Sequence, residues 1–139
     1  MSVIDQSDKE FAGRKDSARR YPDFIIGGAP KCGTTSLHFI LDQHKDISIP
    51  HDEVHFFDAD DPTSHPDFLA VKNGQLSWWD PGSKSDEHLD WYAGRFANAK
   101  KNQLIGEDST TYLLSEVAPR RIHALLPNVR MIFMLRHPV

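Results

Sequence analysis

The chain has 139 residues, a formal net charge of −4 and a pI of about 6.0. Its length suffices for one small domain with its own core, and the acidic balance excludes the basic face that nucleic-acid binding requires. Cys32 is the only cysteine, which excludes a disulfide framework within the chain and a zinc ribbon. No stretch has the apolar pattern of a signal peptide or a membrane span, so we expect a cytoplasmic protein.

The two ends of the chain differ in character. Residues 1–20 are polar and charged throughout, so we expect them to be disordered or loosely docked. The last residues, VRMIFMLRHPV, have the pattern of a buried strand, and the chain stops three residues after Arg136. Natural domains seldom end directly after such a strand, so we expect a truncated domain over residues 21–139.

Strands and helices are predicted to alternate in the first half of this domain. The apolar run 24–27 predicts a strand, and residues 35–44 predict a helix with one apolar face. Residues 46–50 predict a short extended piece, followed by a loop over 51–58 whose aromatic side chains point inward. Prolines, glycines and scattered polar residues over 60–85 predict an insertion or a lid.

The same alternation continues to the end of the chain. Residues 85–99 predict a helix, residues 103–108 a strand, residues 115–126 a second helix and residues 130–136 a last strand. Strands that alternate with helices indicate a parallel sheet. We therefore predict an α/β, P-loop-like three-layer fold, with a central parallel sheet and helices on both faces.

The segment after the first strand, GAPKCGTTS, is typical of an anion-binding loop. Gly28 and Gly33 have the separation of the Walker A glycines, but Thr34 stands where Walker A has its lysine, and Lys31 lies earlier in the loop. Backbone amides at a helix N-terminus bind anions without further help. Lys31 adds an ammonium group that can bind a phosphate-like group. Further hydrogen-bond donors are the hydroxyl groups of Thr34, Thr35 and Ser36.

The predicted last strand carries an arginine where a magnesium-dependent nucleotide site has an aspartate. Arg136 would repel a metal ion and attract a second phosphate. The sequence therefore predicts a phosphate-like ligand held without metal, as in sulfuryl transfer. Two alternatives stay open: a metal-dependent nucleotide kinase or triphosphatase with an unusual loop, and a non-catalytic phosphate-binding remnant.

Four motifs, PKCGTTSL, DEVHFFD, GEDSTTYL and MLRHPV, resemble in this order the sulfotransferases that use 3′-phosphoadenosine 5′-phosphosulfate. The heparan-sulfate-type branch and its bacterial relatives are the most similar, and the resemblance covers about residues 22–139, as the N-terminal half of the family's domain. It implies transfer of a sulfuryl group to a hydroxyl or amine of a small molecule or glycan. It also implies that Lys31, Cys32, Gly33, Thr34 and Thr35 hold the 5′-phosphosulfate, and that Arg136 binds the 3′-phosphate.

The resemblance places a catalytic base at Glu53, since this glutamate matches the one that deprotonates the acceptor. We expect Phe56 and Phe57 to wall a pocket that raises the pKa of Glu53. Asp52 replaces the lysine that precedes this glutamate in the family, and His51 is a possible substitute for that charge. His55 is a rival base. His51 and His55 have the spacing of the H-E-x-x-H zinc motif. Glu53 stands one place after the position that the motif requires for its glutamate, so no metal site is predicted.

Other polar and aromatic residues have two interpretations each. The segment 107–112 either lines an acceptor pocket, through Glu107, Ser109 and Tyr112, or forms a strand-to-helix turn with satisfied hydroxyl groups. Four aromatic residues either stack on a sugar or, as we favour, pack in the core or a lid: Trp78, Trp79, Trp91 and Tyr92. Four basic or imidazole side chains are expected on the surface: His38, His44, Arg120 and Arg121.

Overall fold

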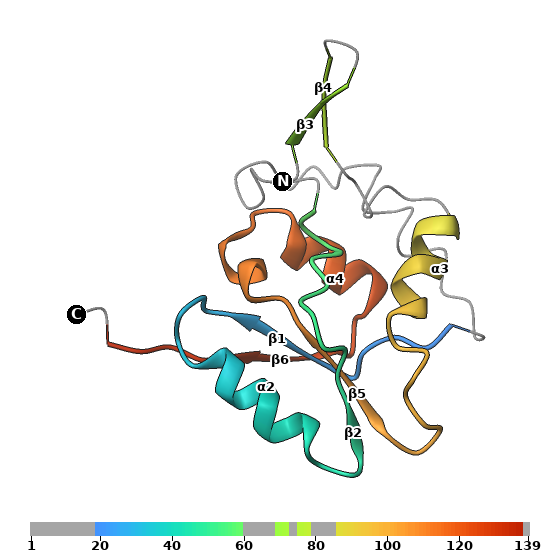
Figure 1. The fold of residues 1–139 in the computed structure, drawn as a ribbon, viewed down its shortest axis with the longest axis vertical. Coiled ribbons are helices and arrows are strands. Elements are labelled where there is room, and N and C mark those ends of the chain that lie inside the picture. The colour runs from blue at the N-terminus through green and yellow to red at the C-terminus, as the bar shows by residue number, and fades with distance from the viewer. Residues whose placement is uncertain (1–18, 60–68, 73–74, 79–85, 138–139) are drawn as a thin grey trace.

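The computed structural model of the chain describes residues 19–59, 69–72, 75–78 and 86–137. Four parallel strands form the main sheet in the order β2-β5-β1-β6 (Figure 1). Their bounds are Phe24–Gly28 for β1, Ile47–Ser48 for β2, Leu104–Asp108 for β5 and Arg130–Phe133 for β6. Residues 1–18, most of the segment predicted to be disordered, lie outside the described residues.

The strand β1 forms the centre of this sheet because it pairs with a parallel neighbour on each side. Phe24 lies opposite Gly106 of β5 and opposite Arg130 of β6. All five residues of β1 are buried, as expected for a strand covered on both faces. Gly106 permits this pairing, because a Cβ atom at that position would lie 2.3 Å from the ring of Phe24.

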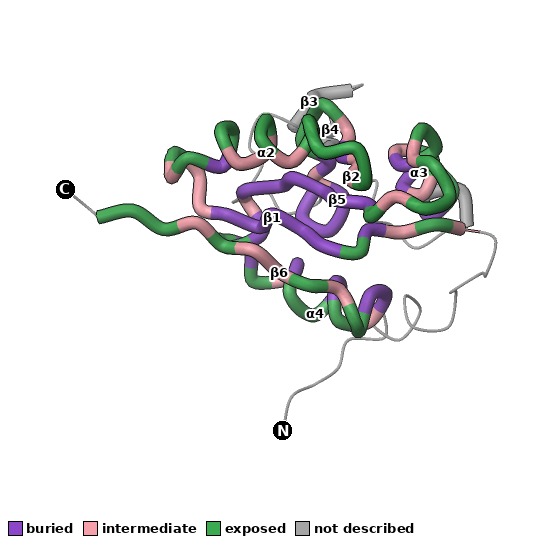
Figure 2. The backbone as a smooth tube through the Cα atoms, turned by 90° about the horizontal axis from the view of Figure 1, so that it is seen from below, coloured by how far each residue is buried: buried purple, intermediate pink, exposed green. Residues whose placement is uncertain are grey.

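Two helices cover opposite faces of the sheet, as Figure 2 shows. The helix α2, Thr34–Asp42, follows β1 on one face, and α4, Ala118–Leu125, precedes β6 on the other. A third helix, α3, spans Asp86–Gly94. The predicted α/β fold with a central parallel sheet is confirmed. No helix in the described part of the chain is long and apolar enough to cross a membrane.

The core consists of two groups of apolar side chains. The larger is built around the aromatic rings of Phe56, Phe57 and Tyr92, which are fully buried, and Ile25 of β1 reaches it. The rings of Phe56 and Tyr92 stack with their centroids 4.1 Å apart. The smaller group packs between β1 and α2 and contains Phe24, Ile26 and Ile49, with Leu37 and Leu41 of the helix against it. The expectation that Tyr92 packs in the core is confirmed.

Several predicted elements differ from those observed. Residues 69–78 of the expected insertion or lid contain an antiparallel hairpin of β3, Leu69–Lys72, and β4, Gln75–Trp78. The sequence signal for it is an Asn-Gly pair between two short alternating runs. The helix predicted at 85–99 ends earlier, at Gly94, and the polypeptide continues in tight turns. The last strand is also shorter than predicted and ends at Phe133.

The helix predicted at 115–126 starts later than expected, and a separate short helix precedes it. A 3₁₀ helix, η2, spans Thr110–Leu114, and α4 begins only at Ala118. Ser115 separates them, because its Oγ accepts a hydrogen bond from the amide of Ala118 at 3.1 Å. A serine whose hydroxyl oxygen accepts the backbone amides that follow it favours a helix start over a helix interior.

Candidate functional site

The loop between β1 and α2 is shaped for an anion. Gly33 precedes the helix with φ 90° and no side chain caps the helix N-terminus. The first intrahelical bond runs from Leu37 N to Gly33 O at 3.2 Å, so the amides of the first turn have no partner within the helix. These amides and the positive end of the helix dipole attract a negatively charged group. Lys31 lies in the same loop with φ 61°.

Hydrogen bonds to the strand β6 and its continuation hold this loop in place. Ala29 N donates to Met134 O at 2.9 Å, and Met134 N donates to Gly28 O at 2.8 Å. The guanidinium of Arg136 donates from Nη1 to the backbone oxygen of Lys31 at 3.3 Å. The structure therefore brings Arg136 to the anion loop, as the sequence predicts, although the two lie 105 residues apart in the chain.

A cleft of about 660 Å³ opens in front of the loop. One wall is the loop and the first turns of α2, and the other is the segment 51–53 with the end of β5. Its lining residues are Pro30, Lys31, Gly33, Thr34, Thr35, His38, Phe39, Asp42, His51, Asp52, Glu53, Asp108 and Thr110. The anion loop and the predicted base thus share one cleft. Cys32 and Ser36 do not line it.

The carboxylate of Glu53 is held by three hydrogen bonds. Its Oε1 accepts from the amide of Thr110 at 3.0 Å and from the hydroxyl of Thr110 at 2.6 Å. Its Oε2 lies 3.1 Å from Nε2 of His55. The hydrogen bond from His55, together with those from Thr110, lowers the pKa of Glu53 to about 2, although partial burial acts in the opposite direction.

The predicted rise in the pKa of Glu53 is therefore wrong. Phe56 and Phe57 do not wall a pocket around this carboxylate, because both rings lie in the core and are fully buried. His55 takes φ 53°, a left-handed backbone conformation that is uncommon for residues other than glycine. The chain turns at this residue, so that Glu53 faces the cleft while the two phenylalanines face the core.

Both ring nitrogens of His55 have partners. Nε2 faces Glu53, and Nδ1 lies 3.1 Å from Oγ1 of Thr111. Burial of the ring disfavours its charged form, but the hydrogen bond and charge of Glu53 raise the pKa of His55 above its usual value. Glu53 and His55 thus form an ion pair at the rim of the cleft. The neighbouring pair, His51 and Asp52 at 3.1 Å, is almost fully exposed.

A second carboxylate–histidine pair in the cleft was missed from the sequence. Nδ1 of His38 lies 2.8 Å from Oδ2 of Asp108, and the two side chains are 14% and 7% exposed. The expectation that His38 is a surface residue is wrong, because β5 brings Asp108 against its helix. Burial raises the pKa of Asp108, and the hydrogen bond from His38 opposes this rise. The only sign of this pair in the sequence is that Asp108 ends the predicted strand 103–108, which belongs to the same predicted sheet as the strand before the anion loop.

Glu107 does not line an acceptor pocket, and the alternative of a turn with satisfied hydroxyl groups is confirmed. Its carboxylate is fully buried and accepts hydrogen bonds from the hydroxyls of Tyr92, Tyr112 and Ser109. The hydroxyl of Tyr112 in turn accepts the amide of Phe56 at 3.0 Å. This network is part of the core and supports the end of β5, from which the cleft residues Asp108 and Thr110 follow.

Arg121 is also buried, contrary to the expected solvated helix face. Its Nη1 donates to the backbone oxygen of Phe57 at 3.1 Å, and the residue is 8% exposed. Arg120, its neighbour on α4, is exposed as expected. The difference follows from the direction of α4, which turns Arg121 toward the segment that carries Glu53.

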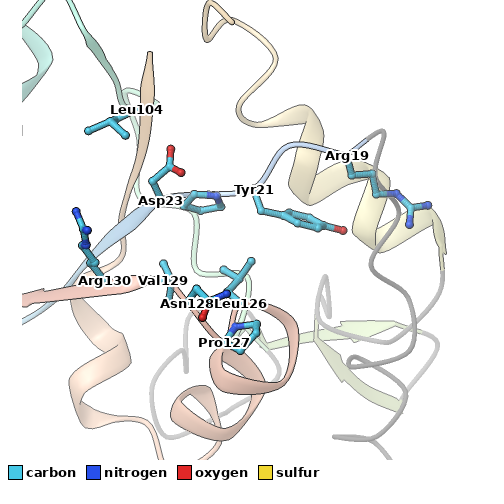
Figure 3. A pocket seen from close by; sticks show the side chains of 10 residues that line it. Arg19, Tyr21, Asp23, Leu104, Leu126, Pro127, Asn128, Val129 and Arg130 are labelled. Atoms are coloured by element: carbon cyan, nitrogen blue, oxygen red, sulfur yellow. The ribbon is translucent and has the colours of Figure 1, made fainter. Parts of the chain in front are cut away.

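A second pocket, of about 420 Å³, lies at the opposite ends of the strands (Figure 3). Asp23, Leu104 and Arg130 line it at the starts of β1, β5 and β6. Asp23 accepts the amide of Ile105 at 2.8 Å and so supports the sheet. Ligands of open parallel sheets bind at the carboxyl ends of the strands, so the cleft beside the anion loop is the functional candidate.

Comparisons with known proteins agree with this geometry. Mouse heparan sulfate glucosamine 3-O-sulfotransferase 6 is 31% identical over 121 residues, which are 87% of this chain and 28% of that protein. Human bifunctional heparan sulfate N-deacetylase/N-sulfotransferase 2 is 32% identical over 143 residues, with 96% of this chain and 14% of that protein covered. The chain thus spans under a third of the length of these relatives.

A solved structure has the same fold. The crystal structure of a sulfotransferase from Alicyclobacillus acidocaldarius is similar with a TM-score of 0.60 and 32% sequence identity, and the match covers 84% of this chain and 45% of that one. The family model described as "Sulfotransferase family" matches residues 22–139. The resemblance on which the sequence prediction rested is confirmed, and the chain belongs to the sulfotransferase family.

Proposed function

We propose that this protein transfers a sulfuryl group from 3′-phosphoadenosine 5′-phosphosulfate to a hydroxyl or amine of a carbohydrate. The observation that carries the proposal is the single cleft in which the lysine-bearing anion loop faces Glu53 and Asp108. Donor and acceptor must meet in one place for an in-line transfer. The relatives support the carbohydrate, since those named above are heparan sulfate sulfotransferases.

The residues of the loop fit an anionic donor. Gly33 leaves the helix N-terminus uncapped, and Lys31, Thr34 and Thr35 line the cleft beside it. We assign the 5′-phosphosulfate to these groups, with the backbone of Cys32 and the hydroxyl of Ser36 as the other predicted contacts. Amides and an ammonium group placed here stabilise the negative charge that builds up on the leaving phosphate.

Arg136 is the proposed ligand of the 3′-phosphate. Its guanidinium touches the loop backbone at Lys31 and is otherwise exposed, so it can reach an anion next to the loop. The acceptor binds on the opposite wall, where the sequence predicts Glu53, with His55 as its rival, as the group that takes the proton. Transfer without a metal ion and a cytoplasmic location also remain predictions.

Calorimetry of adenosine 3′,5′-bisphosphate against the full-length protein, in buffer with a chelator, tests the donor site. Binding is expected without divalent cation, and Lys31→Ala is expected to weaken it while Lys45→Ala, outside the cleft, leaves it unchanged. Transfer of labelled sulfate from the donor to a glucosamine-bearing heparan oligosaccharide tests the reaction. Binding of ATP with Mg²⁺ but not of the bisphosphate would favour the nucleotide kinase or triphosphatase instead, and donor binding without transfer to any acceptor would favour the non-catalytic remnant.

A further inference from the structure

We propose that the acceptor of this protein is a carbohydrate that carries protonated amino groups, and no sulfate or carboxylate group, where it meets the cleft. The proposal rests on the proposed sulfuryl transfer and deepens it by naming the charge of the acceptor. It concerns recognition alone and leaves the proton transfer as proposed above. The observation that carries it is the distribution of charge over the residues that line the cleft.

Carboxylates outnumber lysines and arginines in the lining of the cleft. Four lining residues are acidic: Asp42, Asp52, Glu53 and Asp108. Lys31 is basic, but it belongs to the anion loop and is assigned to the donor. Among the described residues that line the cleft beyond the loop, none is a lysine or an arginine. The part of the cleft that is left for the acceptor is therefore acidic.

The histidines of this region do not supply a surplus of positive charge. Each of three histidines lies within about hydrogen-bonding distance of a carboxylate: His38 of Asp108, His51 of Asp52, and His55 of Glu53. A protonated histidine in such a pair offsets the charge of its own carboxylate. Sulfate or carboxylate groups of a polyanionic glycan would thus face like charges without a cation to pair with, which disfavours binding.

Asp108 offers a hydrogen-bond acceptor that the protein itself does not use. Its side chain is 7% exposed and its Oδ2 lies against His38, while its Oδ1 is buried and has no hydrogen-bond partner in the described parts of the chain. Burial raises the pKa of Asp108 against the hydrogen bond from His38, and the charge of Glu53 raises it further. A cationic N–H group bound here would satisfy Oδ1 and reduce the repulsion between the two carboxylates.

The ammonium group of an amino sugar matches these features. It is positively charged and has three hydrogens to donate, and its hydrogen bonds to carboxylates are stronger than those between neutral groups. Asp42 and Asp52 are exposed at the cleft, so their charges attract a cationic acceptor as it approaches. Asp108 is then the contact inside the cleft. A neutral sugar gains less from this wall, and a sulfated one is repelled by it.

Calorimetry with three tetramers of one sugar tests the charge of the acceptor. The tetramers are built of glucosamine and carry free amino, N-acetyl or N-sulfo groups. They are titrated slightly below neutral pH into the full-length protein saturated with adenosine 3′,5′-bisphosphate, a complex in which no transfer can take place and a blocked nitrogen costs no reaction. The free-amine tetramer is expected to bind at least about tenfold more tightly than the N-acetylated one, and the N-sulfated one most weakly.

Three variants locate the preference in the cleft. Asp108→Asn is expected to weaken binding of the free-amine tetramer about tenfold or more, and Asp52→Asn about two- to fivefold, because its charge is exposed. The matched control is Asp46→Asn, since Asp46 is exposed and does not line the cleft; it should bind all three tetramers as wild type does. Bisphosphate affinity, measured first, shows that each variant has kept a folded donor site.

Tighter binding of the N-sulfated than of the free-amine tetramer, or equal binding of the free-amine and N-acetylated tetramers, would overturn the proposal and leave sulfuryl transfer intact. Equal losses in Asp46→Asn and Asp52→Asn would also overturn it, because the attraction would then come from the net charge of the protein. Failure of the wild-type protein to bind the bisphosphate would instead refute the donor site, and titration of the tetramers into the protein alone would still decide which charge the cleft prefers.

The transfer assay gives a second readout of the same preference. The free-amine tetramer is expected to have a higher kcat/KM than the heparan oligosaccharide, which is the polyanionic acceptor, and the difference should shrink in Asp108→Asn. A higher kcat/KM for the heparan oligosaccharide would contradict the proposal while confirming sulfate transfer.

Discussion

Removal of the hydroxyl group of Tyr112 is expected to destabilise the fold more than removal of that of Tyr92. Both hydroxyls donate to the fully buried carboxylate of Glu107, and a hydrogen bond to a charged group contributes about 1.5–3 kcal/mol. The hydroxyl of Tyr112 also accepts the buried amide of Phe56. An amide left without a partner costs about 1–3 kcal/mol more, so Tyr112→Phe should cost about 2.5–6 kcal/mol and Tyr92→Phe about 1.5–3 kcal/mol.

Urea denaturation of the two single variants and the double variant at pH 7 measures these losses. A double-mutant cycle is required, because the two tyrosines share one carboxylate and their effects should not add. Equal losses below about 1 kcal/mol in both variants would refute the reasoning, since they would mean that Glu107 is satisfied by other groups. Bisphosphate affinity of folded Tyr92→Phe should equal that of wild type, because its hydroxyl group lies in the core.

Three further predictions concern the loop and the rim of the cleft. Lys31→Ala should weaken bisphosphate binding at least about tenfold, which is about 1.4 kcal/mol; calorimetric affinity equal to wild type would remove Lys31 from the site. Gly33→Ala should destabilise the fold by about 1–2 kcal/mol, because φ is 90° there. The control is Gly94→Ala, where the added Cβ atom meets open space. Thermal unfolding should show that this control changes the stability by no more than about 1 kcal/mol. The lowered pKa of Glu53 should stabilise the fold above pH 4.5, and this stabilisation should be lost as pH falls toward 2. The raised pKa of His55 should stabilise the fold below pH 6.5, and this stabilisation should be lost at higher pH. Each contribution is at most about 1 kcal/mol, because Glu53 is 38% exposed. Urea denaturation at several pH values measures it. If Glu53→Gln lost as much stability as wild type between pH 4.5 and pH 2, the contribution assigned to Glu53 would be wrong.

The sequence was sufficient where neighbouring residues carry the information. The run before Gly28 predicts the central strand, and the loop with its early lysine predicts an anion site, because both depend on residues within one turn of each other. The hydroxyl-rich start of α2 belongs to the same stretch. The parallel sheet also follows from the sequence, since strands alternate with helices along the chain. The structure reproduces the central strand, the helix that follows the loop and the parallel sheet, and anion binding by the loop stays a prediction.

The sequence was insufficient where adjacent residues face different surroundings. Phe56 and Phe57 follow Glu53 closely in the chain, so the sequence favoured a shared pocket and a raised pKa. The positive φ of His55 separates them in space, because it sends the rings into the core and leaves the carboxylate in the cleft. Arg121 differs from Arg120 for a similar reason: the helix face, which depends on how α4 docks, decides which guanidinium is buried.

The sequence by itself determined the loop, the alternation of main-sheet strands with helices, and the family to which the chain belongs, because these follow from short stretches and from motifs in order. Only the tertiary structure decided the chemistry of the opposite wall. His38 and Asp108 are 70 residues apart in the chain, and Glu53 and Thr110 are 57 apart. They meet because β5 pairs with β1 in a fixed register, with Ile26 opposite Asp108, and the pKa values of Glu53 and Asp108 depend on the partners that this pairing provides.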